Sequence, residues 1–125
     1  MAVASSSYPE IIDLILERTN LKKYFQVIVS GQEAGKSKPE PDIFILTAQK
    51  LGVNPECCLV VEDSANGIKA ANAAGMICMA YQGPGADPKG AKRSRCHYAT
   101  LDDAVDKWDL QLSSRPKLHD FLSPL

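Results

Sequence analysis

The sequence predicts an α/β fold in which a parallel sheet is covered by helices on both faces. Short apolar runs alternate along the chain with segments whose apolar residues recur at helical spacing. Glycine, proline, serine and asparagine stand between these segments, as is typical where strands and helices end. Strands that are joined by helices run parallel, and such sheets bind ligands beyond the carboxyl ends of their strands.

The first part of the chain supplies two strands and the helix between them. The strands are expected at residues 1–4 and 26–30. The helix begins at Pro9, which suits a first helical turn, and ends near Asn20. Its broad apolar face consists of Ile11, Ile12, Leu14, Ile15 and Leu16.

The alternation continues through the rest of the chain. The next segments are a helix opened by Pro41 and closed by Gly52, a strand at 58–62, a helix between Ser64 and Gly75, and a strand at 76–81. A loop at 83–92, a short strand at 96–99, a helix at 101–108 and a tail at 113–125 are expected to follow. We therefore expect one domain over residues 1–112.

Composition and charge exclude several classes of protein. With 45% hydrophobic and 23% charged residues, the chain falls in the range of a soluble globular domain. Its formal charge of -1 gives no basic excess for binding nucleic acid. The apolar runs are far shorter than the roughly 20 residues that cross a bilayer, and the start has no basic region typical of a signal peptide. We expect neither a nucleic-acid nor a membrane partner, and a cytoplasmic location.

The four cysteines do not indicate a metal or redox site. They show neither a C-x-x-C pair nor the paired spacing of a zinc site, and they are Cys57, Cys58, Cys78 and Cys96. Free cysteine is among the most buried residue types, so we expect these residues to pack as small apolar side chains at strands.

Polar side chains follow three of the predicted strands. They are Ser5, Ser6 and Ser7 after the first strand, Lys36 and Lys38 in the loop after the second, and Glu62 and Asp63 at the end of the third. Hydroxyl groups can hold phosphate oxygens, a lysine can neutralise their charge, and carboxylates can hold Mg²⁺. The combination favours phosphoryl-transfer chemistry at the carboxyl edge of the sheet.

Each group also has a simpler interpretation. The serines can form a solvated turn, the lysines can be surface charges, and Glu62 and Asp63 can begin a helix. The coincidence of all three groups at strand ends favours a common site. Between the two lysines, Lys38 has the better-fixed backbone because Pro39 restricts the residue before it.

The same residues resemble three motifs of the haloacid dehalogenase superfamily. The second motif resembles the strand ending in Ser5, the third resembles the run around Lys38 and Pro39, and the fourth resembles the strand ending in Glu62 and Asp63. The resemblance covers roughly residues 1–108 and implies the beta-phosphoglucomutase and sugar-phosphatase branch, with a three-layer Rossmannoid fold.

The resemblance implies a role for each candidate residue. Ser5 and Lys38 would be catalytic side chains, phosphate would be bound by Ser5, Ser6, Ser7 and Lys38, and Mg²⁺ would be held by Asp63 with Glu62. The substrate would be a small phosphorylated metabolite such as a sugar phosphate. Tyr8 stands where beta-phosphoglucomutase carries a basic residue, which favours phosphatase over mutase activity.

One motif of the superfamily has no counterpart in the sequence. No D-x-D follows an apolar strand, and no helical cap domain precedes Ser5, so the nucleophilic aspartate has no candidate here. In the resembled fold the D-x-D strand lies between the strands expected at 1–4 and 58–62. We therefore expect the chain alone to be inactive, and a missing N-terminal segment or another chain to complete the sheet.

The sequence disfavours two other classes of α/β protein and leaves one alternative open. A dinucleotide-dependent oxidoreductase needs a G-x-G-x-x-G turn, which the sequence lacks. A two-component receiver domain carries its lysine late in the chain, whereas Lys38 precedes Asp63. A catalytically inactive domain of the same family, which binds phosphate and metal or serves assembly, remains the open alternative to an enzyme.

Overall fold

The structure, a computed structural model, describes residues 1–81 and 96–98. Its elements follow the expected order: β1 (Ala2–Ser5), α1 (Pro9–Arg18), β2 (Val27–Ser30), α2 (Asp42–Leu51), β3 (Leu59–Glu62), α3 (Ala65–Ala73), β4 (Ile77–Tyr81) and β5 (Cys96–Tyr98). Two short 3-10 helices, η1 (Lys22–Tyr24) and η2 (Pro55–Cys57), are not predicted by the sequence pattern. The loop expected at 83–92, the helix at 101–108 and the tail at 113–125 lie outside the described residues.

The predicted start of α3 and the predicted ends of α2 and α3 are confirmed by the residues found there. The Ser64 hydroxyl accepts a hydrogen bond of 3.0 Å from the backbone N–H of Gly67, which makes it the N-cap of α3. Gly52, after α2, has φ of 70°, and Gly75, after α3, has φ of 74°. This left-handed conformation is one that glycine adopts readily and that commonly terminates helices. Asn20, beyond α1, has φ of 56°.

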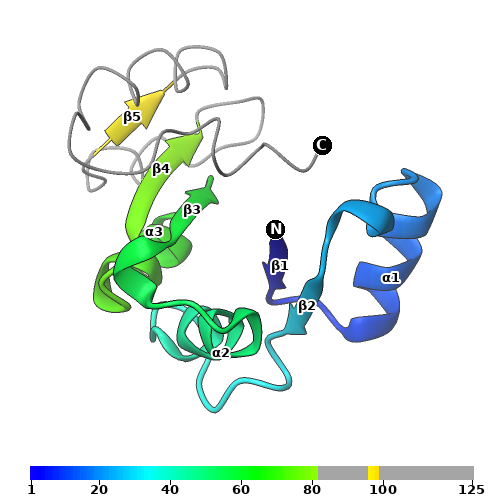
Figure 1. Ribbon diagram of the computed structural model, residues 1–125, viewed down its shortest axis with the longest axis horizontal. Helices are drawn as coiled ribbons and strands as arrows, with labels where there is room; N and C mark the ends of the chain where they lie inside the picture. The colour runs from blue at the N-terminus through cyan, green and yellow to red at the C-terminus, as the bar shows by residue number, and fades with distance from the viewer. Residues whose placement is uncertain (82–95, 99–125) are drawn as a thin grey trace.

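The strands form two parallel sheets rather than one continuous sheet. One sheet contains β1 and β2, and the other contains β3, β4 and β5 in that order. Among the described strands, β1 and β3 are not hydrogen-bonded to each other, and Figure 1 shows them at neighbouring edges of the two sheets. The interruption lies where the family resemblance implies a further strand.

The backbone of β1 shows which groups face this interruption. The carbonyl of Met1 accepts a bond from Gln26, and the carbonyl of Ser5 accepts one from Gly31, so both point toward β2 and the loop that follows it. Successive residues of a strand point their backbone groups to alternate sides. The carbonyl of Ala4 therefore points away from β2, toward the side on which β3 lies.

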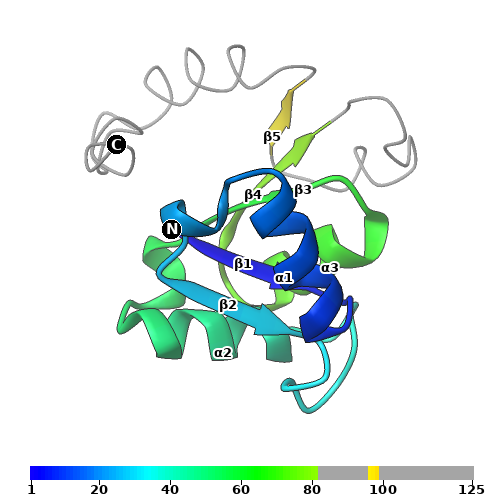
Figure 2. The ribbon, with the colours of Figure 1, turned by 90° about the vertical axis from the view of Figure 1, so that its right-hand side faces the viewer.

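The helices enclose a core that joins the two sheets. Figure 1 shows α1 and α2 on opposite sides of the β1 and β2 pair, and α2 packs against β1, β2 and α3. Figure 2 shows α2 running beneath β2. The buried residues of this core are Val29, Ile43, Phe44, Ala48, Val60, Ile68, Ala70, Ala71, Ala74, Met76, Cys78 and Ala80. Burial of each large aliphatic side chain stabilises the fold by about 1.5–3 kcal/mol, so this shared core holds the two sheets together.

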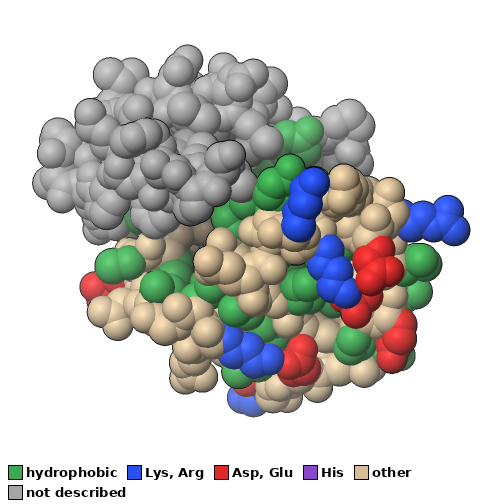
Figure 3. Space-filling model, turned by 45° about the vertical axis from the view of Figure 1, so that its right-hand side comes forward, with side chains coloured by type: hydrophobic (Ala, Val, Ile, Leu, Met, Phe, Trp, Pro, Cys, Tyr) green, Lys and Arg blue, Asp and Glu red, His purple; other side chains and the backbone are tan. Residues whose placement is uncertain are grey.

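Helix α1 buries less of its apolar face than the sequence pattern suggests. Ile12 and Leu16 are buried, whereas Ile11, Leu14 and Ile15 are 45%, 51% and 54% exposed. On the face drawn in Figure 3, hydrophobic side chains lie among charges of both signs. No helix within residues 1–81 and 96–98 is long and apolar enough to cross a membrane.

The cysteines correct one detail of the sequence analysis. Cys78 is buried in β4 as expected, but Cys57 is exposed because it lies in η2 rather than at the start of β3. Cys58 is half-buried, and this burial raises the pKa of its thiol.

Candidate phosphate and metal site

A cavity of about 370 Å³ opens at the carboxyl ends of β1, β3 and β4. Its lining residues come from the ends of β1, β3 and β4 and from the loop between β2 and α2, and they are Ala4, Ser5, Ser6, Lys38, Val61, Glu62, Asp63, Ser64 and Tyr81. The structure thus brings five of the predicted site residues together. Ser7 and Lys36 do not line the cavity.

Lys38 crosses the interruption between the two sheets. Its ammonium group forms an ion pair with the Glu62 carboxylate at the end of β3, and it lies 3.5 Å from the Ala4 carbonyl of β1. The side chains of the pair are 12% and 10% exposed, so water screens them little. The ammonium group also lies 4.8 Å from the centre of the Phe44 ring, within the range of a cation–π contact. The peptide bond between Lys38 and Pro39 is cis.

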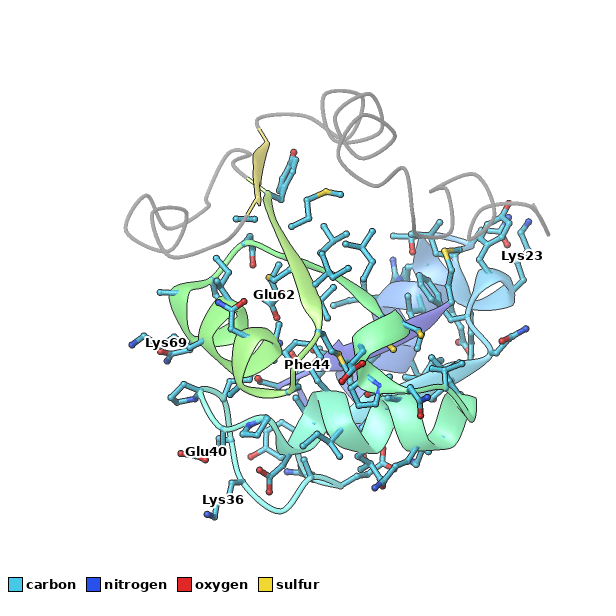
Figure 4. The ribbon with its side chains drawn as sticks, turned by 60° about the vertical axis from the view of Figure 1, so that its left-hand side comes forward. Lys23, Lys36, Glu40, Phe44, Glu62 and Lys69 are labelled. Carbon is cyan, nitrogen blue, oxygen red and sulfur yellow. The ribbon has the colours of Figure 1, made fainter. Side chains whose placement is uncertain are left out.

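The two lysines of the loop differ in exposure and in contacts. Figure 4 shows Lys36 projecting away from the protein, whereas Glu62 and Phe44 lie in its interior. Lys36 is exposed, and no ion pair of the described residues includes it. Of the two, Lys38 is placed to contact a ligand in the cavity.

Glu62 is held in place by the start of α3. Its second carboxylate oxygen accepts a hydrogen bond of 3.0 Å from the Ser64 hydroxyl and a longer one of 3.4 Å from the Ser64 N–H. Gly67, one turn into α3, leaves the space that the carboxylate occupies, since a Cβ atom at Gly67 would overlap it. Each carboxylate oxygen of Glu62 therefore has a partner: Lys38 for one oxygen and Ser64 for the other.

Of the three serines at the end of β1, two line the cavity and the third does not. Ser5 and Ser6 line the cavity. The Ser5 hydroxyl oxygen accepts a bond of 3.2 Å from the Ser7 N–H, which leaves its proton available for donation. The Ser7 carbonyl accepts a bond of 2.7 Å from the hydroxyl of Ser30, at the end of β2. Ser7 therefore ties the loop together rather than facing the cavity.

Asp63 is exposed at the cavity, beyond the end of β3. No group of three side chains that could hold a metal occurs within residues 1–81 and 96–98. Mg²⁺ commonly takes only one or two protein carboxylates and completes its shell with phosphate oxygens and water. Asp63, with Glu62 beside it, fits that requirement, whereas a metal that needs three or four protein ligands would not be satisfied by these residues.

Three residues near the site are not predicted by sequence reasoning. Ser64 is expected as a helix cap, yet its hydroxyl also bonds Glu62. Phe44 follows from the helical pattern as a core residue, but nothing in the pattern indicates its contact with Lys38. Ser30 ends the apolar strand β2. A hydroxyl at a strand end is the same signal that marks Ser5, so it could have marked Ser30 as a further candidate.

Comparison with known proteins identifies the family of the chain. A model of the haloacid dehalogenase-like hydrolase family matches residues 1–75, more than half of the chain. The chain belongs to this family. Over 76 residues it is 43% identical to the fructose-1-phosphate phosphatase YqaB of Escherichia coli (strain K12), a match that covers 61% of this chain and 40% of that protein.

Two solved structures of the family have the same fold. A Thermotoga maritima protein provisionally assigned as a beta-phosphoglucomutase aligns with a TM-score of 0.71 and 32% identity, covering 78% of this chain and 46% of that one. CbbY from Rhodobacter sphaeroides, in complex with phosphate, aligns with a TM-score of 0.73 and 27% identity, covering 80% and 46%. The chain thus spans less than half the length of each of these three relatives.

Proposed function

We propose that this chain carries the phosphate- and magnesium-binding part of a phosphatase that acts on a small phosphorylated metabolite such as a sugar phosphate. The observation that carries the proposal is the cavity in which Ser5, Lys38 and Asp63 meet, at the carboxyl ends of two strands, β1 and β3, that are not hydrogen-bonded to each other. The similarity to a fructose-1-phosphate phosphatase supports the substrate class.

Phosphate would bind between the serine loop and the lysine. Ser5 and Ser6 would supply hydrogen-bond donors to the cavity, and Lys38, which also lines it, would supply positive charge. Two like charges 4 Å apart repel by roughly 4 kcal/mol at an effective dielectric of 20. A phosphate beside Asp63 and Glu62 therefore needs both Lys38 and a cation.

Asp63 would be the main protein ligand of Mg²⁺, with Glu62 as the second candidate. When bound, the ion would neutralise charge on the transferring phosphoryl group. Glu62 already contacts Lys38 and Ser64, so Asp63 is the carboxylate with more freedom to take a ligand. Its exposed position at the cavity supports this assignment.

The two facing strand edges would be completed by a further parallel strand. An open edge presents backbone N–H and C=O groups that accept another strand. The carbonyl of Ala4 faces the interruption. Val61 of β3 is 50% exposed although it lies within a strand, and it lines the cavity. We propose that a missing N-terminal segment or another chain occupies this gap and brings the nucleophilic aspartate, which the described residues do not provide.

Titration with inorganic phosphate tests the binding part of the proposal. The purified chain is titrated with phosphate, with and without Mg²⁺, and binding is followed by ³¹P NMR. We expect Lys38→Ala to weaken binding at least tenfold and Lys36→Ala to change it less than twofold. Equal effects at the two lysines, or no phosphate binding by the unaltered chain, would contradict the proposal. Phosphate binding without turnover after completion of the sheet would instead support the non-enzymatic alternative.

A further inference from the structure

A buried hydroxyl at the end of β2 lies next to the serine loop. Ser30 is 2% exposed. Its hydroxyl donates a hydrogen bond of 2.7 Å to the Ser7 carbonyl and accepts one of 3.2 Å from the Gln32 N–H. A buried hydroxyl with both functions satisfied fixes the position of its partners, because breaking either bond leaves a buried polar group unpaired.

The residue after Ser30 brings the two loops into close contact. The Gly31 N–H donates a hydrogen bond of 2.7 Å to the Ser5 carbonyl. A Cβ atom at Gly31 would lie 3.1 Å from the Cα atom of Ser6, which is tighter than ordinary van der Waals contact. The backbone of the serine loop therefore rests directly on the backbone that follows β2.

Ser30 is itself anchored to α2. Its N–H donates a bond of 3.0 Å to one oxygen of the Glu33 carboxylate. The other oxygen of Glu33 lies 2.5 Å from the Lys50 ammonium group on α2. A chain of contacts thus runs from α2 through Glu33 and Ser30 to the Ser7 carbonyl.

We infer that Ser30 is a positioning residue for phosphate binding, which it supports by holding the serine loop in the conformation that turns Ser5 and Ser6 toward the cavity. With its carbonyl fixed by Ser30, Ser7 directs its N–H to the Ser5 hydroxyl oxygen. The Ser5 proton then remains to be donated to a ligand. The inference rests on the proposed function only in naming phosphate as that ligand.

The test compares Ser30→Ala with Thr47→Val. Thr47 is also buried, and its hydroxyl also donates a bond of 2.7 Å to a backbone carbonyl, that of Ile43, but this bond lies within α2. Ser30→Ala loses two hydrogen bonds and Thr47→Val loses one, so both should lower the unfolding midpoint. We expect Ser30→Ala to weaken phosphate binding about 3- to 10-fold by ³¹P NMR titration, and Thr47→Val to change it less than twofold.

Amide hydrogen exchange provides a second readout that needs no ligand. The Ser7 amide should exchange at least several times faster in Ser30→Ala than in the unaltered chain, and at an unchanged rate in Thr47→Val. Lower stability with unchanged phosphate affinity and unchanged Ser7 exchange would overturn the inference. Should the unaltered chain bind no phosphate, the proposed function fails, and Ser7 exchange alone decides the positioning role.

A second variant covers the case in which Ser30→Ala does not fold. Ser30→Cys nearly keeps the side-chain volume, but its thiol is a weak donor. The same loss of phosphate affinity and the same faster Ser7 exchange are expected. A folded Ser30→Cys variant that matches the unaltered chain in both measurements would refute the role of the hydroxyl.

Discussion

The Lys38 ammonium group is paired with the Glu62 carboxylate, and this contact links the loop before α2 to the end of β3. The pair connects the loop that follows one sheet to the end of a strand in the other. Both side chains are about nine-tenths buried, so each restrains the other more than a surface pair would. Glu62 therefore sets the position from which Lys38 reaches the cavity.

Removal of the Glu62 charge should make Lys38 accessible. In Glu62→Gln, the pair is replaced by a weaker contact, and we expect acylation of Lys38 by a water-soluble reagent to speed up several-fold relative to Lys36. Peptide mass spectrometry measures the two rates in one sample. Glu40→Gln is the matched control, because Figure 4 shows the Glu40 side chain projecting away from the site. Equal Lys38 rates in both variants would show that Glu62 does not restrain it.

A methyl group at position 67 should also free Lys38, because it would displace the Glu62 carboxylate. Gly67→Ala places a Cβ atom where the Glu62 carboxylate lies, so the carboxylate must move away from Ser64 and Lys38. Overpacking of this kind costs about 1–3 kcal/mol, which denaturant unfolding can measure. Gly52→Ala is a useful contrast, since nothing lies within 4 Å of its Cβ position and its cost arises from φ of 70° alone. Faster Lys38 acylation is expected in Gly67→Ala but not in Gly52→Ala.

The contribution of Glu33 to stability should depend on pH. The hydrogen bond from Lys50, and then that from the Ser30 N–H, hold the pKa of Glu33 below its ordinary value of 4.5. A carboxyl group whose pKa is lowered by folding stabilises the protein above the unfolded-state pKa, and this contribution is lost as the pH falls through the folded-state pKa. Glu33→Gln should therefore be less stable than the unaltered chain at pH 7, and the difference should shrink below pH 4.5.

Urea unfolding at pH 7 and in the acid range measures this difference. Glu33 is 41% exposed, so the effect at pH 7 should be small. Glu40→Gln again controls for the loss of one negative charge. A Glu33→Gln effect that is the same at every pH would contradict the assignment.

The backbone amides along the facing edges of β1 and β3 should exchange their hydrogens quickly. Backbone groups without partners are costly when buried, at about 1–3 kcal/mol each, so we expect the chain alone to recruit a completing strand or to self-associate. Light scattering and hydrogen exchange on the purified chain measure both effects. A stable monomer with slowly exchanging amides along both facing edges would rule out the open gap.

Much of the fold follows from local chemistry that the sequence displays. Ser64, Gly52 and Gly75 mark helix ends because capping and left-handed φ values depend on the residue type itself. The exposed side chains of α1 could not be predicted in the same way, because the pattern of Ile11 and Ile15 shows an apolar face but not what covers it. The extent of burial depends on neighbours distant in the sequence.

In the candidate site, too, some features could be predicted from the sequence and others could not. Ser5, Lys38 and Asp63 could be predicted because each follows a strand, and parallel strands bring their ends together. The pairing of Glu62 with Lys38 and the bond from Ser30 to Ser7 depend on side-chain directions across two sheets. No spacing along the chain encodes those directions, so only the structure reveals them.

A chimera tests the central claim most directly. This chain replaces the matching part of the Escherichia coli fructose-1-phosphate phosphatase, and the Mg²⁺-dependent release of phosphate from fructose 1-phosphate is measured. We predict turnover by the chimera, none by this chain alone, a loss of at least 100-fold with Lys38→Ala or Asp63→Ala, and little change with Lys36→Ala. A folded chimera without turnover, or one that tolerates Lys38→Ala and Asp63→Ala, would contradict the account.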